Sequence, residues 1–455
     1  MIERILVPFE GEGSGTDELS WGQGEIWRAM QRHRSWMPLI NVTPLTAGTT
    51  IEDIATELRF RMSRYQSMRT RLTFDAGDRP RQVVSGSGVT TLEIIDADGD
   101  PAAAAAAIES QYAETDLDLV NDWPLRITVI RHQGTPTHMV SAVCHLAIDL
   151  FGTLAMTADL ADRDPRTGQP RAPTPPMPPL EQARRQRAPA ARRVSDTAMR
   201  YWENLLKTVP PRRFANQASQ RQPRYWQARF DSPALYLAAR AIDARNQVGA
   251  SPVLLAAVAV ALARVTASNP VLVRVVVSNR FRPGLAQSVS QVSQTGLCVI
   301  DVADITFDEA VARAWRSSMA AYKHAYYDPV QLDELVARLS REQGEEIDIN
   351  CYYNDRRMQA PRDSAGPACA EQDLRAALPH TTLRWDPPVD RPSERFFVHA
   401  DDEPGSVTIV MSADTKYISP GDMEACLRGM EEIAVAAATD LAAPTHVSPG
   451  QKQPR

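Results

Sequence analysis

Lysine is scarce in this chain. Only four of the 50 basic residues are lysines, at positions 207, 323, 416 and 452, and the rest are arginines. A nucleotide-binding loop of the GxxxxGK[ST] type needs a lysine after a glycine-rich turn, and no such run is present. Schiff-base chemistry likewise has few candidate nucleophiles. The scarcity therefore makes lysine-dependent catalysis a poor explanation of this protein.

Long apolar runs are also missing, because no stretch approaches the 18 uninterrupted apolar residues of a membrane-spanning helix. The N-terminus, MIERILVPFEGEGSG, lacks the basic start and the apolar stretch of a secretory signal. The formal charge of −6 gives no general attraction to nucleic acid or to anionic lipid. We expect a cytoplasmic protein with neither nucleic-acid nor membrane partners.

Cysteine and metal-binding patterns are absent too. The five cysteines are scattered and never in CxxC spacing, and no HExxH motif occurs. We therefore expect neither disulfides nor a bound metal. There is no GxSxG nucleophile elbow, and the Gly11, Gly13 and Gly15 run has the wrong spacing for a dinucleotide loop.

The 455 residues suffice for two or three domains. Residues 166–193 are rich in proline and arginine, which is typical of an extended linker and less so of a proline-rich recognition motif. The sequence thus predicts an N-terminal lobe over 1–165, a linker over 166–193, a C-terminal lobe over 194–440 and a disordered tail over 441–455. Helices and strands alternate in both halves, which favours two α/β lobes.

Local patterns predict the main elements. Ser20 with Gln23, Thr50, Asp100 with Pro101, and Ser251 are expected to begin helices. Helices are predicted at 21–33, 51–65, 101–112, 151–161, 196–206, 252–266, 307–322, 331–339 and 421–437. Strands are predicted at 38–42, 125–131, 138–144, 271–278, 296–302, 347–353, 381–385, 396–400 and 407–412.

Among the eight histidines, His145 has the most suggestive position. It follows a strand and precedes a loop with Asp149 and then a helix. Strand ends that break into loops often carry catalytic side chains, because the sheet fixes the residue and the loop leaves room for a substrate. The local pattern by itself favours the alternative, a core histidine followed by an aspartate that caps the next helix.

Several segments resemble condensation domains of nonribosomal peptide synthetases. The Cys144–Asp149 stretch, CHLAID, resembles the HHxxxDG motif, with the second histidine and the aspartate kept. Further motifs of that family are similar to residues 20–27, to 69–74 with 79–84, and to 116–119 with 123–126. In the second half, Tyr201 and Trp202, and residues 278–283 with 289–295, follow the family's order.

The resemblance extends over about residues 5–440. It implies the chloramphenicol-acetyltransferase-like architecture, in which two similar α/β lobes form a V with a tunnel between them. It also implies that His145 is the catalytic histidine, which accepts a proton from the attacking nucleophile or orients it. Asp149 would be structural and would pair with Arg280 of the second lobe. Removing one partner of such a buried pair costs about 3–5 kcal/mol.

The chain also departs from the family pattern. Cys144 replaces the first histidine of the motif, and Leu150 replaces the glycine after the aspartate, where a branched side chain would narrow the tunnel. Strand alternation predicts that Cys144 packs rather than reacts. The glycine at position 152 could offset Leu150. Gln294, Thr295 and Asn350 are further expected tunnel-lining positions.

The resemblance implies a free-standing, monomeric condensation enzyme that joins an acyl or aminoacyl thioester to an amine, or to an alcohol. The donor would arrive on the 4'-phosphopantetheine of a carrier protein supplied in trans, and the acceptor would be free or carrier-bound. No cofactor would be bound to the enzyme itself. Two alternatives remain: a non-catalytic platform that recruits a carrier or tailoring enzyme, and an acyl-coenzyme A-dependent acyltransferase of the same superfamily.

Overall fold

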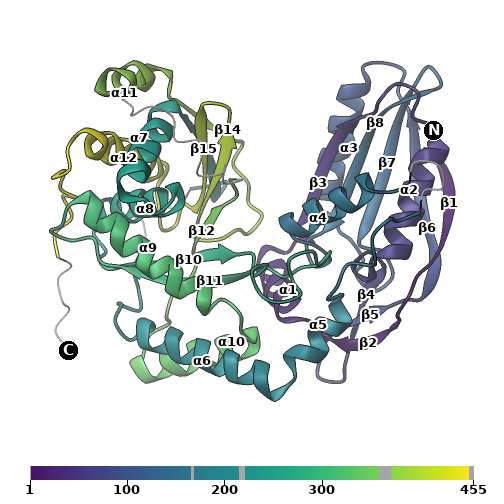
Figure 1. Cartoon of the computed structure of the whole chain (residues 1–455), viewed down its shortest axis with the longest axis horizontal. Coiled ribbons are helices and arrows are strands. Elements are labelled where there is room, and N and C mark those ends of the chain that lie inside the picture. Colours follow the sequence, from purple (N-terminus) through teal and green to yellow (C-terminus); the bar gives the residue numbers. More distant parts are fainter. Residues whose placement is uncertain (1, 165–168, 215–220, 358–369, 450–455) are drawn as a thin grey trace. The chain divides into compact units, whose positions relative to one another are not determined.

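The computed structural model describes residues 2–164, 169–214, 221–357 and 370–449, and the chain divides into two compact units (Figure 1). Unit 1 comprises Met1–Arg193 together with Ser278–Gln294, and unit 2 comprises Val194–Val277 and Thr295–Arg455. Cys369, one of the five cysteines, lies outside the described residues.

Unit 1 is built on a five-stranded sheet with the strand order β1-β6-β7-β8-β3 and a smaller sheet with the order β2-β5-β4. Strands β6 and β7 run parallel, and the other neighbours in both sheets run antiparallel. The elements of this unit are β1 (Ile2–Glu10), β2 (Gly15–Glu18), α1 (Trp21–His33), β3 (Pro38–Pro44), α2 (Ile51–Arg64), η1 (Gln66–Arg69), β4 (Thr70–Phe74), β5 (Pro80–Val84), β6 (Ser87–Asp96), α3 (Pro101–Glu114), β7 (Leu125–His132), β8 (Thr135–Cys144), α4 (Leu150–Ala161) and α5 (Pro179–Gln186).

Side-chain alternation along β8 gives unit 1 a core on each face of its larger sheet. Met139 and Val143 pack with residues of α2 and α4 on one face. Val140, Ala142 and Cys144 pack with residues of α1 and α3 on the other. This period-two division is what a strand buried on both faces requires.

Unit 2 contains a seven-stranded sheet with the order β11-β10-β12-β14-β15-β9-β13. Helices α7, α8, α9 and α12 form a core with one face of it, and α6 and α10 contribute to a second core with Leu272 and Leu297. The elements are α6 (Pro189–Leu206, which begins in unit 1), β9 (Tyr225–Ser232), α7 (Pro233–Asn246), α8 (Ala250–Thr266), β10 (Val271–Val277), β11 (Gln294–Ile300), α9 (Phe307–Lys323), α10 (Pro329–Gln343), β12 (Cys351–Asp355), α11 (Glu371–Ala377), η3 (Leu378–His380), β13 (Thr382–Trp385), β14 (Phe396–Glu403), β15 (Ser406–Asp414) and α12 (Pro420–Thr439).

Three of the four predicted helix starts are confirmed. Ser20 and Gln23 form a capping box on α1, Thr50 caps α2, and Asp100 caps α3 with Pro101 at its first position. Ser251 does not cap α8, because that helix begins at Ala250, one residue before it. No single helix in the described ranges is long and apolar enough to cross a membrane, and α7 with α8 reaches that criterion only as a pair bent by 116°.

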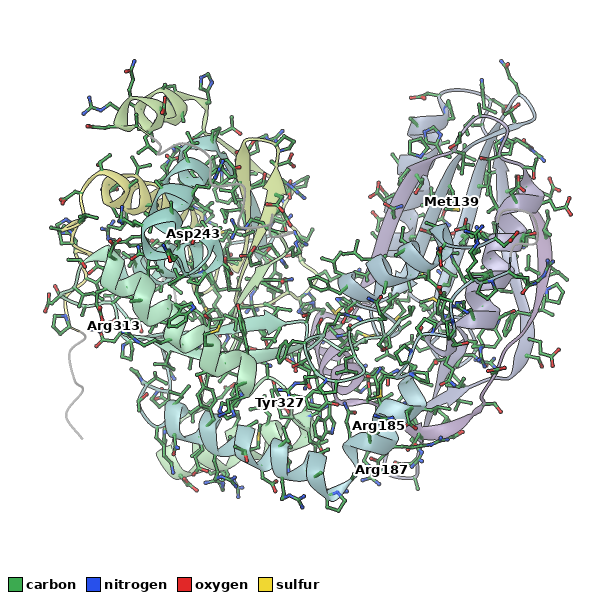
Figure 2. All side chains as sticks on the ribbon, viewed as in Figure 1. Met139, Arg185, Arg187, Asp243, Arg313 and Tyr327 are labelled. Carbon is green, nitrogen blue, oxygen red and sulfur yellow. The ribbon has the colours of Figure 1, made fainter. Side chains whose placement is uncertain are left out.

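The expected extended linker is wrong for much of 166–193. Helix α5 begins at Pro179 and buries Leu180 and Ala183, so this stretch packs against unit 1 instead of spanning solvent. Arg187, labelled in Figure 2, follows α5. It donates through Nη2 to Asp17 Oδ2 of β2 at 3.0 Å. Residues 165–168 lie outside the described residues.

Two further boundaries differ from the prediction. The tail is ordered through its described part, because Ala443, Thr445 and Val447 are buried and their backbone carbonyl and amide groups bond to residues 304–307. Residues 450–455 of the expected tail lie outside the described residues. The strand expected at 347–353 is displaced to Cys351–Asp355. Asp348 lies before it in a polar turn, where its carboxylate accepts a hydrogen bond from Asn350 N and forms ion pairs with Arg213 and Arg395.

Candidate functional site

His145 stands in the turn that joins β8 to α4. Its backbone N–H donates to Met37 O at 3.2 Å, and the Ala147 N–H closes the turn on Cys144 O at 2.9 Å. The side chain is neither fully buried nor fully exposed. Because β8 ends at Cys144, the backbone of His145 has left the sheet while its position is still fixed by it.

A hydrogen bond to the backbone sets the tautomer of the neutral His145 ring. Nδ1 lies 3.0 Å from Ile148 O. A carbonyl oxygen can only accept, so Nδ1 carries the hydrogen, and in the neutral ring the lone pair is on Nε2. This tautomer is the one that a general base acting through Nε2 requires.

Asp149 is the N-cap of α4 and collects five hydrogen bonds. Its Oδ1 accepts from Gly152 N at 2.7 Å and from Arg280 Nη2 at 2.6 Å. Its Oδ2 accepts from Val292 N at 3.0 Å and from the Ser293 N–H and hydroxyl, both at 2.9 Å. Both interpretations of Asp149 are therefore correct, since one carboxylate caps the helix and also pairs with a cation.

Arg280 forms the ion pair with Asp149 that the family resemblance implied. Both side chains are almost completely buried. Arg280 also donates to the backbone oxygens of Leu285, Ser288 and Ser290. The expectation that this arginine belongs to the second lobe is wrong, because these bonds hold Ser278–Gln294 within unit 1.

Cys144 packs and does not line a substrate site. Its side chain is fully buried, and its thiol donates to Trp36 O at 3.3 Å. Burial raises the pKa of this thiol to about 12, which keeps it protonated at neutral pH. The predicted packing role is confirmed, and the expected lining role is wrong.

Leu150 and Gly152 differ in burial, since the first is exposed and the second is buried. Leu150, the first residue of α4, leaves 41 % of its surface exposed. Gly152 is buried, and a Cβ there would lie 2.7 Å from Ile148 Cγ1 and 3.0 Å from Ser290 O. The space beside Gly152 is thus filled by the protein, so this glycine does not offset Leu150 by leaving room for a substrate.

The three other expected tunnel positions are engaged within the protein. Gln294 is buried in unit 1 and donates to Glu25 Oε2 at 3.4 Å. Thr295 Oγ1 in unit 2 accepts from Arg274 Nη2 at 2.6 Å. The Asn350 backbone N–H donates to Asp348 Oδ1 at 2.8 Å, just before β12 begins. The side chains of Gln294 and Thr295 are thus held by polar contacts within the protein, whereas the contact of Asn350 is made by its backbone.

Ser293 and Gln182 belong to the site but were missed by sequence reasoning. Ser293 falls inside the 289–295 segment that resembles a family motif, and that resemblance is the signal in the sequence that could have indicated it. Gln182 donates to Ser288 and Ser290 from α5. No sequence pattern marks it, because the surrounding proline and arginine composition conceals a buried helix.

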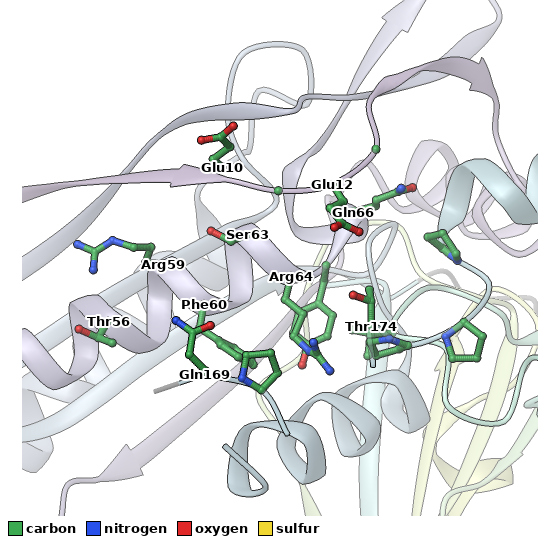
Figure 3. Close-up of a pocket in the computed structure, with 18 residues that line it drawn as sticks. Glu10, Glu12, Thr56, Arg59, Phe60, Ser63, Arg64, Gln66, Gln169 and Thr174 are labelled. Atoms are coloured by element: carbon green, nitrogen blue, oxygen red, sulfur yellow. The ribbon is translucent and has the colours of Figure 1, made fainter. Parts of the chain in front are cut away.

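A cavity of about 800 Å³ lies elsewhere in unit 1 (Figure 3). Its walls come from α2, from residues 10–13 between β1 and β2, and from the proline-rich stretch 169–178. Figure 3 shows Arg59, Ser63 and Arg64 projecting from α2 beside it. His145, Asp149 and Arg280 do not line this cavity. In the described ranges, no group of three or more His, Cys, Asp or Glu side chains could hold a metal ion.

Comparison with protein families gives a match over residues 33–364, most of the chain, to the family described as "Condensation domain". This chain belongs to the condensation-domain family. The resemblance drawn from its motifs is thereby confirmed. No curated protein matches it in sequence.

Three solved structures share the fold of this condensation domain. One, from work on condensation domain-mediated chain release from the enacyloxin polyketide synthase, has a TM-score of 0.71 at 21 % identity and covers 98 % of this chain and 86 % of its own. SgcC5 from Streptomyces globisporus has a TM-score of 0.69 at 18 % identity, and the match covers 94 % of this chain and 100 % of SgcC5. The X-domain in complex with OxyB from teicoplanin biosynthesis has a TM-score of 0.70 at 15 % identity, covering 98 % of each chain. The predicted α/β fold of the chloramphenicol-acetyltransferase-like type is confirmed.

Proposed function

We propose that this condensation domain joins an acyl or aminoacyl thioester to an amine, or less readily to an alcohol, with His145 as the proton acceptor. The observation that carries the proposal is the 3.0 Å bond from His145 Nδ1 to Ile148 O, which reserves Nε2 for a substrate proton. Membership of the condensation-domain family supports the reaction type.

His145 alone can accept and return the proton that the reaction transfers. The acceptor nitrogen attacks the thioester carbonyl, and a C–N bond forms as the nitrogen gives a proton to His145 Nε2. When the tetrahedral intermediate collapses, the C–S bond breaks and the proton passes to the leaving thiolate. A positioned general base of this kind contributes about 10²–10⁴-fold to the rate.

We further propose that the donor is carried on the 4'-phosphopantetheine of a carrier protein. The enacyloxin and teicoplanin relatives come from natural-product assembly, which supports this kind of donor. An acyl-coenzyme A donor is the alternative. Equal turnover with acyl-coenzyme A when carriers are omitted would favour that alternative.

The test is a product assay by mass spectrometry. Carrier proteins loaded with different acyl groups are mixed with candidate amines and with wild-type protein, His145→Ala or His132→Ala. His132, the last residue of β7, is a matched control, because its Nδ1 also bonds to a backbone carbonyl, Ala97 O at 2.8 Å. We expect an amide product with the wild type and His132→Ala and at least a 100-fold loss with His145→Ala. Full turnover by His145→Ala would contradict the role given to this residue.

A docking platform without catalysis is the second candidate. A solved structure with the same fold, the X-domain from teicoplanin biosynthesis, is in complex with OxyB, and Cys144 departs from the family's motif. This candidate predicts that wild-type protein and His145→Ala bind a carrier or an enzyme partner equally and that neither makes product.

A further inference from the structure

Gln182 of α5 is a buried polar residue, with only 3 % of its surface exposed. Its side-chain amide Nε2 lies 2.6 Å from Ser290 Oγ, 2.7 Å from Met177 O and 3.1 Å from Ser288 Oγ. All three acceptors lie within unit 1. One amide therefore ties α5 both to the chain before it and to a segment more than 100 residues later in the sequence.

The two serines continue this connection toward the candidate catalytic turn. Ser288 O accepts from Arg280 Nη1 at 2.6 Å, and Ser290 O accepts from Arg280 Nη2 at 3.3 Å. Arg280 in turn donates to Asp149 Oδ1 at 2.6 Å. Asp149 follows the carbonyl of Ile148, which holds the His145 ring. A series of hydrogen bonds, joined by the backbone within residues 288–290 and between Ile148 and Asp149, thus leads from α5 to His145.

The side chain at position 182 must donate for this series to hold. The Ser288 and Ser290 hydroxyls lie 2.7 Å apart, and the Ser288 hydroxyl also donates to Met177 O at 2.8 Å. An apolar side chain at 182 would remove the amide donor of the buried Ser290 hydroxyl oxygen and would leave Met177 O with the Ser288 hydroxyl in place of two donors. A lost donor to buried oxygen atoms favours movement of the surrounding backbone. The first backbone to move would be 288–290, whose carbonyls hold Arg280.

We propose that Gln182 is a positioning residue for His145: by holding Ser288 and Ser290 it fixes Arg280 and Asp149, and through them the turn that carries the base. The inference rests on the proposed function, since it assigns Gln182 to the geometry of that same site. Small displacements of a reacting group lower the rate strongly, because catalysis depends on its orientation.

The experiment compares Gln182→Leu with Gln186→Leu. Gln186 lies one helical turn later in α5 and is equally buried, at 4 % exposed, and its Oε1 accepts from Trp21 N at 2.8 Å, at the start of α1. Hydrogen exchange is measured for peptides that cover 145–149 and 288–294, and kcat and KM are measured with a carrier-bound thioester. Ser290→Ala is a milder variant that removes one acceptor and keeps α5 intact.

We expect Gln182→Leu to exchange about tenfold faster in both peptides, 145–149 and 288–294, and to lose about tenfold in kcat with less than a twofold change in KM. Ser290→Ala should move both readouts in the same direction. The variant that carries both Gln182→Leu and Ser290→Ala should lose less in kcat than the product of the two single losses, because the residues act in series. Gln186→Leu should resemble the wild type in exchange at 288–294 and in kcat.

Equal kcat in Gln182→Leu and wild type overturns the proposal, and so does an equal loss in Gln186→Leu. Product formation separates this result from failure of the proposed function. If the wild-type protein makes no product with any thioester, the proposed function fails, and exchange decides alone whether Gln182 positions the turn. Unchanged exchange at 145–149 in Gln182→Leu then overturns the proposal.

Discussion

Arg280 Nη2 lies 2.6 Å from Asp149 Oδ1, although the two residues are 131 positions apart in the chain. The pair joins the N-cap of α4 to the 278–294 segment, which leaves β10 and returns at β11. His145 precedes the same cap by four residues. The ion pair therefore fixes the residues on the C-terminal side of the histidine's turn, while β8 fixes those on its N-terminal side.

Asp149→Asn tests the cost of breaking this pair. The substitution keeps the shape of the side chain but leaves the Arg280 charge buried without an anion, so we expect a loss of about 3–5 kcal/mol in the free energy of unfolding. Asp96→Asn is the control, because its pair with Arg131 is exposed to solvent and should contribute much less to the free energy of unfolding. Urea denaturation of both variants measures the difference, and similar losses would contradict a special role for the buried pair.

Gly152→Ala tests whether the space at this position is already filled. The added methyl would lie 2.7 Å from Ile148 Cγ1 and 3.1 Å from Arg280 Nη2, so overpacking should cost about 1–3 kcal/mol despite the helix propensity of alanine. Gly429→Ala in α12 is the matched control, because its Cβ would meet Ala261 Cβ at 3.6 Å, an ordinary contact. That variant should gain about 0.5–1 kcal/mol. Thermal unfolding should shift in opposite directions, and two shifts of the same sign would count against this account.

Cys144 should resist alkylation. Burial raises the pKa of its thiol to about 12, so almost no reactive thiolate forms at pH 8. Iodoacetamide should leave the Cys144 peptide unmodified in the folded protein and label it after denaturation in urea, as mass spectrometry of the digested protein would show. Rapid labelling in the folded state would restore Cys144 as a reactive group of the site.

His399 should make unit 2 sensitive to acid. It lies in β14 against the Phe397 ring, with ring centroids 4.0 Å apart, and its burial lowers its pKa to about 3, helped by the charge of Arg356. Its ordinary pKa is about 6.5, so between these values the unfolded chain binds a proton that the folded chain does not. Stability from this group is present above about pH 6.5 and is lost as the pH falls below it.

The variant His399→Phe isolates this effect. Between pH 6.5 and 5 the wild type should lose roughly 2 kcal/mol more than the variant in the free energy of unfolding, since one pKa unit corresponds to about 1.4 kcal/mol. Urea denaturation at both pH values provides the measurement. Parallel pH dependence in the two proteins would show that His399 is protonated without cost in the folded state.

The sequence by itself determined the local features whose causes are local. Ser20, Thr50 and Asp100 mark helix starts, because capping depends on residues within one turn of one another. The alternation along β8 placed Cys144 in a core. The motif around His145 and the order of the other motifs indicated the condensation-domain family and with it the fold.

Only the tertiary structure decided which residues surround His145. The tautomer of its neutral ring depends on Ile148 O, a backbone atom that composition does not reveal. The burial of α5 and the placement of 278–294 in unit 1 depend on bonds between Gln182, Ser288, Ser290 and Arg280, which are far apart in sequence. The surroundings of Gly152 could not be predicted from sequence either, because the space beside this glycine is filled by Ser290 and Arg280, which are distant in the chain. Local pattern specifies an element, whereas the neighbours of a side chain are fixed only when distant segments pack and satisfy one another's polar groups.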